Sequence, residues 1–232
     1  MDFPRKKASL TKWRIAYSLA ILLRRLIGIK YLTIFSLNLS WVTSRLAYEF
    51  SGEYFGDRFR NGALALSELE LLSILKDTDR VLDVGCGTGR WSIVAASKAK
   101  HVLGIDYDPV NLEIAISHNS KAEFILGDIT SGILSKSSFD VALLIHILEH
   151  LDEPGEMLKI LRKICSTVII EVPDRESNPL NWARINLGLD YYTDADHLRE
   201  FNSNEIVELL SQTGWIQNSI TRKGGSLIIV AS

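Results

Sequence analysis

Glycines and acidic side chains gather where an apolar run of this chain meets a polar one. In residues 81–92, VLDVGCGTGRWS, the glycines Gly85, Gly87 and Gly89 fill three of five positions directly after an apolar stretch. Glycine reaches φ values that other residues avoid and loses more backbone entropy on folding, so such a cluster indicates a tight turn that a ligand approaches closely. The segment follows a predicted strand and opens a predicted helix, which is the context of a nucleotide-type binding site.

The spacing of these glycines narrows the class of ligand that the loop can bind. Dinucleotide-binding folds use G-x-G-x-x-G with a pyrophosphate at the helix N-terminus, whereas this loop reads G-x-G-x-G, with Cys86 between the first two glycines. The G-K-[ST] ending of a phosphate-binding P-loop is absent from the segment. Asp83 precedes the loop, and a carboxylate there disfavours a pyrophosphate and favours a ligand that carries an ammonium group.

Two further acids follow the next predicted strands. Asp106 ends the strand HVLGID, 21 residues after Gly85, and can accept hydrogen bonds from both hydroxyls of a ribose. Asp128 ends the strand FILGD and can accept from an adenine amino group, while the amide of Ile129 can donate to a ring nitrogen. Each acid alone is explained as well by a helix cap or a turn. Together, at the ends of consecutive strands, they indicate a ligand with an amino-acid end, a ribose and an adenine.

With these motifs, the chain resembles a class I S-adenosylmethionine-dependent methyltransferase over residues 77–232. The resemblance rests on VLDVGCGTG, GIDYD, GDI, FDVALLIHILEHL and the closing hairpin, and it extends to ubiquinone-pathway and to glycan or lipid methyltransferases. It implies S-adenosylmethionine as cofactor, with Asp106 on the ribose and Tyr107 stacked on the adenine, which Asp128 and Ile129 contact. The methionine part would lie among the residues of the loop, which are Asp83, Gly85, Cys86, Gly87 and Gly89.

The segment IHILEHLDEP is the first candidate for chemistry on the acceptor. We expect His146, Glu149 and His150 on one face of a helical turn at the end of the fourth strand. The favoured interpretation makes Glu149 a substrate-contacting residue that shapes the pocket, with His146 or His150 as the base. A metal site is the alternative, because the run resembles the E-x-x-E-H of ubiquinone-pathway O-methyltransferases. Histidine in place of the first glutamate disfavours magnesium and suits zinc better, and we assign no metal. The zinc-protease reading of H-x-x-E-H does not suit a strand end.

The second candidate region is a loop of about 20 residues, 174–195, followed by DHLREF. Long loops in compact domains usually have a function, and this one follows the fifth strand, where the fold places its acceptor pocket. His197 is a candidate base. The alternative for His197 is a cap and surface pair for helix 203–213, although Asn202 or Ser203 already provides a good cap. The candidate acceptor contacts are Arg184, Tyr191, Tyr192 and Arg199.

The elements that must position these residues alternate between strand and helix from about residue 67. Apolar strands are predicted at 80–85, 101–106, 123–128, 139–145 and 167–172. Helices are predicted at 67–75, 88–99, 109–118, 147–165 and 203–213, which favours a parallel sheet covered on both faces. Closing strands near 215–221 and 226–231 are joined by RKGG, which is short enough only for an antiparallel hairpin. The predicted fold is therefore α/β: a Rossmann-like, doubly wound, seven-stranded sheet with an antiparallel last strand and an N-terminal helical extension.

The N-terminal extension, residues 1–62, differs from the predicted methyltransferase domain, residues 63–232. Residues 1–30 carry a net charge of +7 and the remaining chain −9. Residues 13–29 are predicted to form an amphipathic helix with a basic side, and a second apolar stretch covers 31–42. The arginine pair at 24–25 makes the first stretch too short to span a bilayer, and a signal peptide is a weak match. Residues 1–42 are expected to form a lid on the domain, a membrane-surface anchor, or both.

These observations predict a methyltransferase that acts on a small-molecule, glycan or lipid-linked acceptor. An oxygen acceptor is favoured, because the run after the fourth strand lacks the D/N-P-P-Y pattern typical of nitrogen-specific relatives. The acidic body disfavours nucleic acid as a partner. Two isolated cysteines favour a reducing compartment, so a cytoplasmic protein, in peripheral contact with the inner membrane face in the anchor case, is expected. The alternatives are an NAD-linked oxidoreductase and a non-catalytic cofactor-binding module; the oligomeric state is not predicted.

Overall fold

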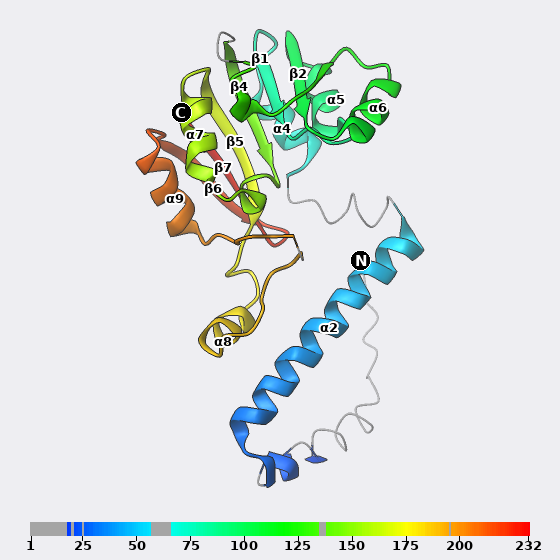
Figure 1. Cartoon of the computed structure of the whole chain (residues 1–232), viewed down its shortest axis with the longest axis vertical. Coiled ribbons are helices and arrows are strands. Elements are labelled where there is room, and N and C mark those ends of the chain that lie inside the picture. The colour runs from blue at the N-terminus through cyan, green and yellow to red at the C-terminus, as the bar shows by residue number, and fades with distance from the viewer. Residues whose placement is uncertain (1–17, 20, 25, 57–65, 135–137, 195) are drawn as a thin grey trace, which may run out of the picture.

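The computed structural model describes residues 18–19, 21–24, 26–56, 66–134, 138–194 and 196–232. A seven-stranded sheet with the order β3-β2-β1-β4-β5-β7-β6 forms the centre of the domain (Figure 1). Strands β1 to β5 run parallel to one another, and β7 is antiparallel to both β5 and β6. This confirms the predicted fold class. The strands are β1 Arg80–Val84, β2 His101–Asp106, β3 Glu123–Leu126, β4 Phe139–Ile145, β5 Cys165–Pro173, β6 Gln217–Lys223 and β7 Ser226–Ala231.

Helices cover both faces of the sheet, as its apolar strands require. On one face, Leu71 of α4 and Trp91 of α5 join a cluster of buried side chains with Val81 of β1. On the other face, Leu158 of α7 and Leu210 of α9 pack in a larger cluster, and helices α7 and α9 lie together on that side (Figure 1). The helices of the domain are α4 Glu68–Ile74, α5 Arg90–Ala96, α6 Pro109–Ser117, α7 Pro154–Arg162, α8 Leu180–Asn186 and α9 Ser203–Gln212, with 3₁₀ turns η1 Ile129–Ser131 and η2 Leu148–His150.

The last two strands form the predicted hairpin. Gly224 and Gly225 connect β6 to β7 with φ values of 58° and 91°. Two consecutive positive φ values are the requirement of the tight turn that matches the twist of an antiparallel pair, and glycine adopts them without a steric cost.

Two predicted elements differ from the structure because of local backbone constraints. The predicted helix 147–165 is divided into η2 and α7, because Leu151 ends η2 in an extended conformation (φ −91°, ψ 138°) and Pro154 occupies the first turn of α7. Before η2, His146 has a positive φ of 55° and so lies outside the helical turn. His146, Glu149 and His150 therefore do not share one face of a helix, which corrects the prediction. The predicted loop 174–195 contains the helix α8.

The N-terminal extension contains one long helix, α2, Ile29–Phe55. Gly28, with φ 86°, separates it from the helical residues 18–19, 21–24 and 26–27. Helix α2 lies apart from the sheet and beside α8 (Figure 1), so a lid packed directly on the sheet is not observed among the described residues. Residues 1–17, which hold five of the eight basic residues among residues 1–30, and the predicted domain boundary at 62 lie outside the described residues.

Candidate active site

The glycine loop after β1 is held against the end of β2 by main-chain bonds. The amides of Gly85 and Cys86 both donate to the carbonyl oxygen of Ile105, at 2.8 and 3.1 Å. Gly85, Gly87 and Gly89 have φ values of 64°, 52° and 82°. A Cβ atom on Gly85 would lie 2.3 Å from Cδ1 of Ile147, whereas one on Gly87 would meet no atom within 4 Å. The loop is thus packed tightly at Gly85 and open at Gly87, where a ligand can approach the backbone.

Asp106 connects this loop to the next turn of the chain. Its carboxylate accepts from the amide of Gly87 at 2.7 Å and from the amide of Asp108 at 2.8 Å. Each carboxylate oxygen has a second lone pair, so Asp106 can still accept from the two hydroxyls of a ribose. The following side chain, Tyr107, is 82% exposed and is available to stack on a ligand ring.

The third predicted acid lies next to Asp106 in space. The amide of Gly127 donates to the carbonyl oxygen of Asp106 at 2.9 Å, which places Asp128 beside the end of β2. The Asp128 carboxylate caps η1 by accepting from the amide of Thr130 at 2.8 Å, and Ile129 is buried. The residues predicted to contact the ribose and the adenine therefore lie together at the carboxyl ends of β2 and β3, and this arrangement fits S-adenosylmethionine.

Asp83 has a structural contact that the sequence did not indicate. Its carboxylate is buried at the end of β1 and accepts from the hydroxyl of Ser92 at 2.6 Å, which fixes the start of α5. Burial raises the pKa of Asp83 to about 7. Direct contact of Asp83 with an ammonium group stays a prediction. Cys86 is also buried, and burial raises the pKa of its thiol to about 12.

His146 lies between two buried glutamates at the end of β4. Its Nδ1 is 3.0 Å from Oε1 of Glu149, and its Nε2 is 3.2 Å from Oε1 of Glu171. A carboxylate only accepts, so both ring nitrogens donate. Burial alone would lower the pKa of His146, but the two carboxylates more than offset this and raise it to about 10. The predicted role of His146 as a base does not agree with this geometry, because neither nitrogen is left to take a proton.

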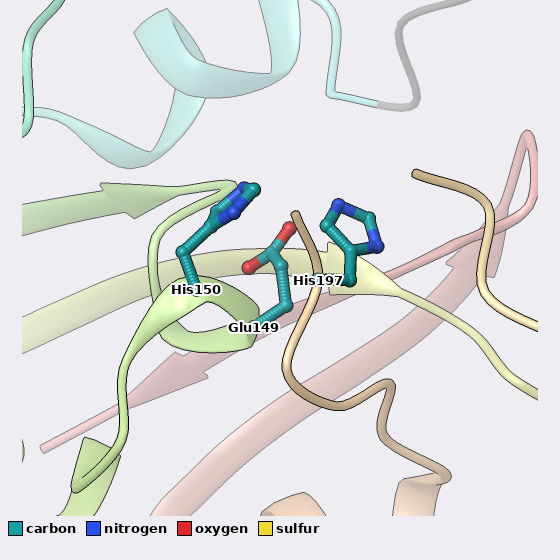
Figure 2. A group of neighbouring side chains, drawn as sticks. All are labelled: Glu149, His150 and His197. Atoms are coloured by element: carbon teal, nitrogen blue, oxygen red, sulfur yellow. The ribbon is translucent and has the colours of Figure 1, made fainter. Parts of the chain in front are cut away.

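His150 and His197, although 47 positions apart, face one another beside Glu149 (Figure 2). Their rings meet edge to face, with centroids 4.8 Å apart. Nδ1 of His150 is 3.3 Å from the carbonyl oxygen of Asp196, and Nδ1 of His197 is 3.1 Å from Oε1 of Glu200. Burial lowers the pKa of His197, but the hydrogen bond to Glu200 raises it, and the net shift of the pKa is upward.

The backbone carbonyl of Glu149 holds these two segments together. It accepts from the amides of Leu198 and Arg199 at 2.9 and 3.3 Å. The guanidinium of Arg199 donates to the carbonyl oxygen of Asp152 at 2.7 Å, so Arg199 also braces this junction. Its predicted contact with the acceptor stays a prediction.

Arg184 connects α8 to α2. It is buried, and its guanidinium donates to the carbonyl oxygen of Leu37 at 2.7 Å and to Oδ1 of Asn38 at 3.2 Å. These bonds use the guanidinium donors that were expected to hold the acceptor. Tyr191 and Tyr192 lie next to one another with ring centroids 4.5 Å apart, and both are half-buried.

Two functional candidates were missed in the sequence. Glu171 is fully buried within β5 and contacts His146, and Glu200 is buried beside His197. An acid inside the apolar run TVIIEV was the available signal for Glu171. Glu200, three residues after His197, had the spacing of a contacting pair.

Comparison with known proteins agrees with this geometry. A family model described as a methyltransferase domain matches residues 56–216, which is more than half of the chain. The chain belongs to the class I S-adenosylmethionine-dependent methyltransferases, and S-adenosylmethionine is the cofactor that the glycine loop fits. The alternative of an NAD-linked oxidoreductase does not agree with this family.

Individual relatives are distant. A probable S-adenosylmethionine-dependent methyltransferase of Mycolicibacterium smegmatis is 27% identical over 58% of this chain and 51% of its own length. A ubiquinone biosynthesis O-methyltransferase of a Caulobacter species is 26% identical over 61% of this chain and 64% of its own. The magnesium protoporphyrin IX methyltransferase of Synechocystis, solved with bound SAH, has a TM-score of 0.57 and 16% identity over 80% of this chain and 97% of its own, which supports the fold. The chain thus spans about half to two thirds of the length of these curated relatives.

Proposed function

We propose that the protein transfers the methyl group of S-adenosylmethionine to a hydroxyl of a small-molecule, glycan or lipid-linked acceptor. The observation that carries the proposal is the pair His150 and His197, assembled at the end of β4 next to the glycine loop. The side chain of Ile147, three residues before His150, packs against Gly85 of that loop. The turn η2, which carries His150 and follows β4, therefore lies next to the donor loop, and this supports an acceptor bound beside the two imidazoles.

The two imidazoles supply the proton acceptor that an alcohol needs. Methyl transfer from a sulfonium is an in-line displacement whose leaving group is neutral, so the protein has to orient the acceptor and remove its proton. Both rings of this pair use Nδ1 in their hydrogen bonds within the described residues. Nε2 of His150 or His197 is then the candidate base. The O-methyltransferase among the relatives supports an oxygen acceptor.

Helix α2 supports an acceptor presented at a membrane surface. One side of the helix is fastened to the domain: Nε1 of Trp41 donates to the carbonyl oxygen of Tyr192 at 3.3 Å, and Arg45 pairs with Asp194 at 3.3 Å. A separate apolar stripe runs along the exposed side, with residues spaced by three or four positions. It consists of Phe35, Leu39, Val42, Leu46 and Phe50, which are between 42% and 63% exposed.

A lipid surface would bury this stripe and attract the basic N-terminal segment. Each basic residue near anionic lipid contributes on the order of 1 kcal/mol, and residues 1–30 carry a net charge of +7. No helix within the described ranges is long and apolar enough to cross a membrane. We therefore propose peripheral contact, with α2 lying along the surface and its Trp41 side turned to the domain.

The test of the acceptor is a labelling experiment. Purified protein and S-adenosylmethionine labelled in the methyl group are added to lipid, glycan and small-molecule extracts of a strain that lacks the protein. Label is expected in one extractable compound, bound through an alkali-stable methyl ether, which is the product of methyl transfer to a hydroxyl. Label found only in protein or RNA would contradict the proposed acceptor class.

The test of membrane contact is flotation with vesicles of phosphatidylglycerol. The double variant Phe35→Glu, Leu39→Glu places two charges on the stripe and is expected to abolish flotation of the full chain. Leu69→Glu is the matched control, because Leu69 is 80% exposed on α4 of the domain. Equal flotation of all three proteins would remove the membrane proposal.

A further inference from the structure

The N-terminal helix α2 contacts the connection between α8 and α9 at residues 190–194, which we call the bridging segment. Nε1 of Trp41 donates to the carbonyl oxygen of Tyr192 at 3.3 Å, and the guanidinium of Arg45 lies 3.3 Å from the carboxylate of Asp194. Trp41 and Tyr192 are 151 positions apart in the sequence. The position of the bridging segment therefore depends on an element from a distant part of the chain.

Arg184 of α8 makes a second attachment among the same elements. Its Nε donates to the carbonyl oxygen of Asp190, at the start of the bridging segment, and its Nη1 donates to the carbonyl oxygen of Leu37 in α2 at 2.7 Å. Its guanidinium carbon also lies 5.5 Å from the centroid of the Trp41 ring, within the distance of about 6 Å that a cation–π contact allows. Because Arg184 is only 3% exposed, these contacts hold α2, α8 and the bridging segment together as one unit.

The other end of the bridging segment is bonded to the carboxylate that contacts His197. The hydroxyl of Thr193 donates to Oε1 of Glu200 at 2.7 Å, and the amide of Thr193 donates to the same oxygen. Nδ1 of His197 lies 3.1 Å from that oxygen as well. A carboxylate only accepts, so Nδ1 of His197 carries a proton, and the lone pair of the neutral ring is on Nε2. Glu200 therefore fixes the tautomer of His197, and Thr193 fixes the position of Glu200.

The ring of His197 lies among carboxylates from two parts of the chain, and Figure 2 shows Glu149 of η2 beside it. The titratable groups that face the ring come from η2 and from residues 194–200, and they are Glu149, His150, Asp194, Asp196 and Glu200. Burial lowers the pKa of His197, but the carboxylates, with Glu200 as the largest contributor, more than offset burial, and the net shift of the pKa is upward. Glu200 thus affects both the orientation of His197 and the strength with which Nε2 binds a proton.

We propose that α2 is a positioning element for His197: through the bridging segment it holds Thr193 and Glu200 where they fix the orientation and the tautomer of the imidazole. Neither Glu200 nor α2 needs to touch the acceptor, because both act through His197. The use of His197 as the base for the acceptor hydroxyl rests on the proposed function, whereas the positioning of its ring does not. Displacement of α2 from the bridging segment would therefore impair proton removal and leave the binding of S-adenosylmethionine intact.

The first experiment is nitrogen-15 NMR of the histidine side chains in the labelled full chain, over about pH 5 to 9, with His197→Gln to assign the signal. The neutral ring of His197 is expected to carry its proton on Nδ1. Glu200→Gln keeps an acceptor for Thr193 but removes the charge, and it should lower the pKa of His197 by about 1 pH unit or more. Trp41→Phe removes the donor to the bridging segment. It should lower this pKa by a smaller amount and speed hydrogen exchange of the Thr193 amide roughly 2- to 10-fold.

The second experiment measures the pH dependence of label transfer to the acceptor extract. A base works only when it is deprotonated, so the rate falls on the acid side of its pKa. In Glu200→Gln this acid limb should move to lower pH by the same amount as the pKa of His197. A purely structural role of Glu200 would lower the rate at every pH and leave the limb in place. The affinity for S-adenosylhomocysteine, measured by calorimetry, should be unchanged in Glu200→Gln and in Trp41→Phe.

Tyr54→Phe is the matched control, because Tyr54 is an aromatic residue of α2 that is 82% exposed. Thermal unfolding verifies that each variant keeps the fold, and Trp41→Phe decides the proposal if Glu200→Gln does not fold. The proposal is overturned if the pKa of His197 is the same in wild type and Glu200→Gln, or if Trp41→Phe behaves like Tyr54→Phe. A chain in which His197 responds as expected, but which transfers no label to a hydroxyl, would support the positioning of His197 by α2 and contradict the proposed function.

Discussion

The donor half of the site and its acceptor half are built in different ways. In the donor half, main-chain amides and short acids on adjacent strands bond to one another, as in the contacts of Gly85 with Ile105 and of Gly87 with Asp106. In the acceptor half, side chains meet residues far away in the sequence. Arg184 bonds to the carbonyl of Leu37, and the Glu171 carboxylate accepts from the amide of Leu66.

This difference has a consequence for what each half can do alone. A loop that binds through its backbone needs glycines at set positions, and its shape is decided by one strand-turn-helix unit. A surface assembled from α2, η2, α8 and the segment around His197 depends on the packing of all four. The donor half should therefore tolerate changes in the acceptor half.

The largest expected effect concerns Asp83 in the donor half and its response to pH. Its pKa is about 7 in the folded protein against 3.8 as the ordinary value, so its proton is held more tightly in the folded state. The stability that it contributes is present below pH 3.8 and is lost as the pH rises to about 7. A shift of about 3 units corresponds to on the order of 4 kcal/mol.

Asp83→Asn removes this titration and keeps an acceptor for Ser92. Urea unfolding between pH 4 and 8 should show the wild type losing stability relative to Asp83→Asn as the pH rises. Parallel curves would mean that Asp83 does not titrate in this range.

The next effect compares one glycine from each half. Gly85→Ala combines a positive φ with a Cβ that would lie 2.3 Å from Ile147, whereas Gly188→Ala, beyond α8, has a φ of 66° and no atom within 4 Å. We expect a loss of about 1 kcal/mol in unfolding free energy for Gly188→Ala. In Gly85→Ala, overpacking against Ile147 should add about 1–3 kcal/mol to the loss of unfolding free energy. Chemical denaturation measures both, and Ile147→Ala in the same chain should recover the added part. Equal losses for the two glycine variants would contradict the packing argument.

Asp106 and Glu200 provide a comparison of binding. Asp106→Asn replaces one of the two carboxylate oxygens with an NH₂ group and removes the negative charge. It should weaken the affinity for S-adenosylhomocysteine roughly 10- to 100-fold, since a charge-assisted hydrogen bond contributes about 1.5–3 kcal/mol. Glu200→Gln should leave that affinity unchanged. Isothermal titration calorimetry measures the affinity of each variant for S-adenosylhomocysteine. Asp140→Asn, at the opposite end of β4, is the control far from the site. A comparable loss of affinity in Glu200→Gln would show that the acceptor half affects donor binding and would contradict the separation of the two halves.

The smallest effect concerns the attachment of α2. Arg184→Met removes the bonds to Leu37 and Asn38, and we expect a loss of about 1 kcal/mol in local stability. Hydrogen exchange of the α2 amides should become faster, while S-adenosylhomocysteine affinity stays the same. Arg222→Met, which removes the ion pairs of Arg222 with buried Asp174 and exposed Glu176, should leave α2 exchange unchanged. Unaltered exchange in Arg184→Met would mean that other contacts hold the helix.

The same difference explains what the sequence could predict. The sheet, its antiparallel last strand and the positions of Asp106 and Asp128 follow from apolar runs and from acids at strand ends. The predicted helix 147–165 was wrong over its first turns, because the extended backbone of Leu151 between η2 and α7 cannot be read from residue type. The roles of Arg184 and Glu200 were missed because they depend on contacts with α2 and with His197, and such contacts leave no local pattern.

The most direct test of this account is the affinity of the double variant His150→Gln, His197→Gln for S-adenosylhomocysteine, measured by calorimetry alongside label transfer to the acceptor extract. We predict a dissociation constant within about twofold of wild type, because donor binding needs only the glycine loop and its neighbouring acids. We also predict that label transfer to the acceptor is lost. A tenfold weaker affinity in parallel with the loss of transfer would show that the two halves form one unit and would contradict the account.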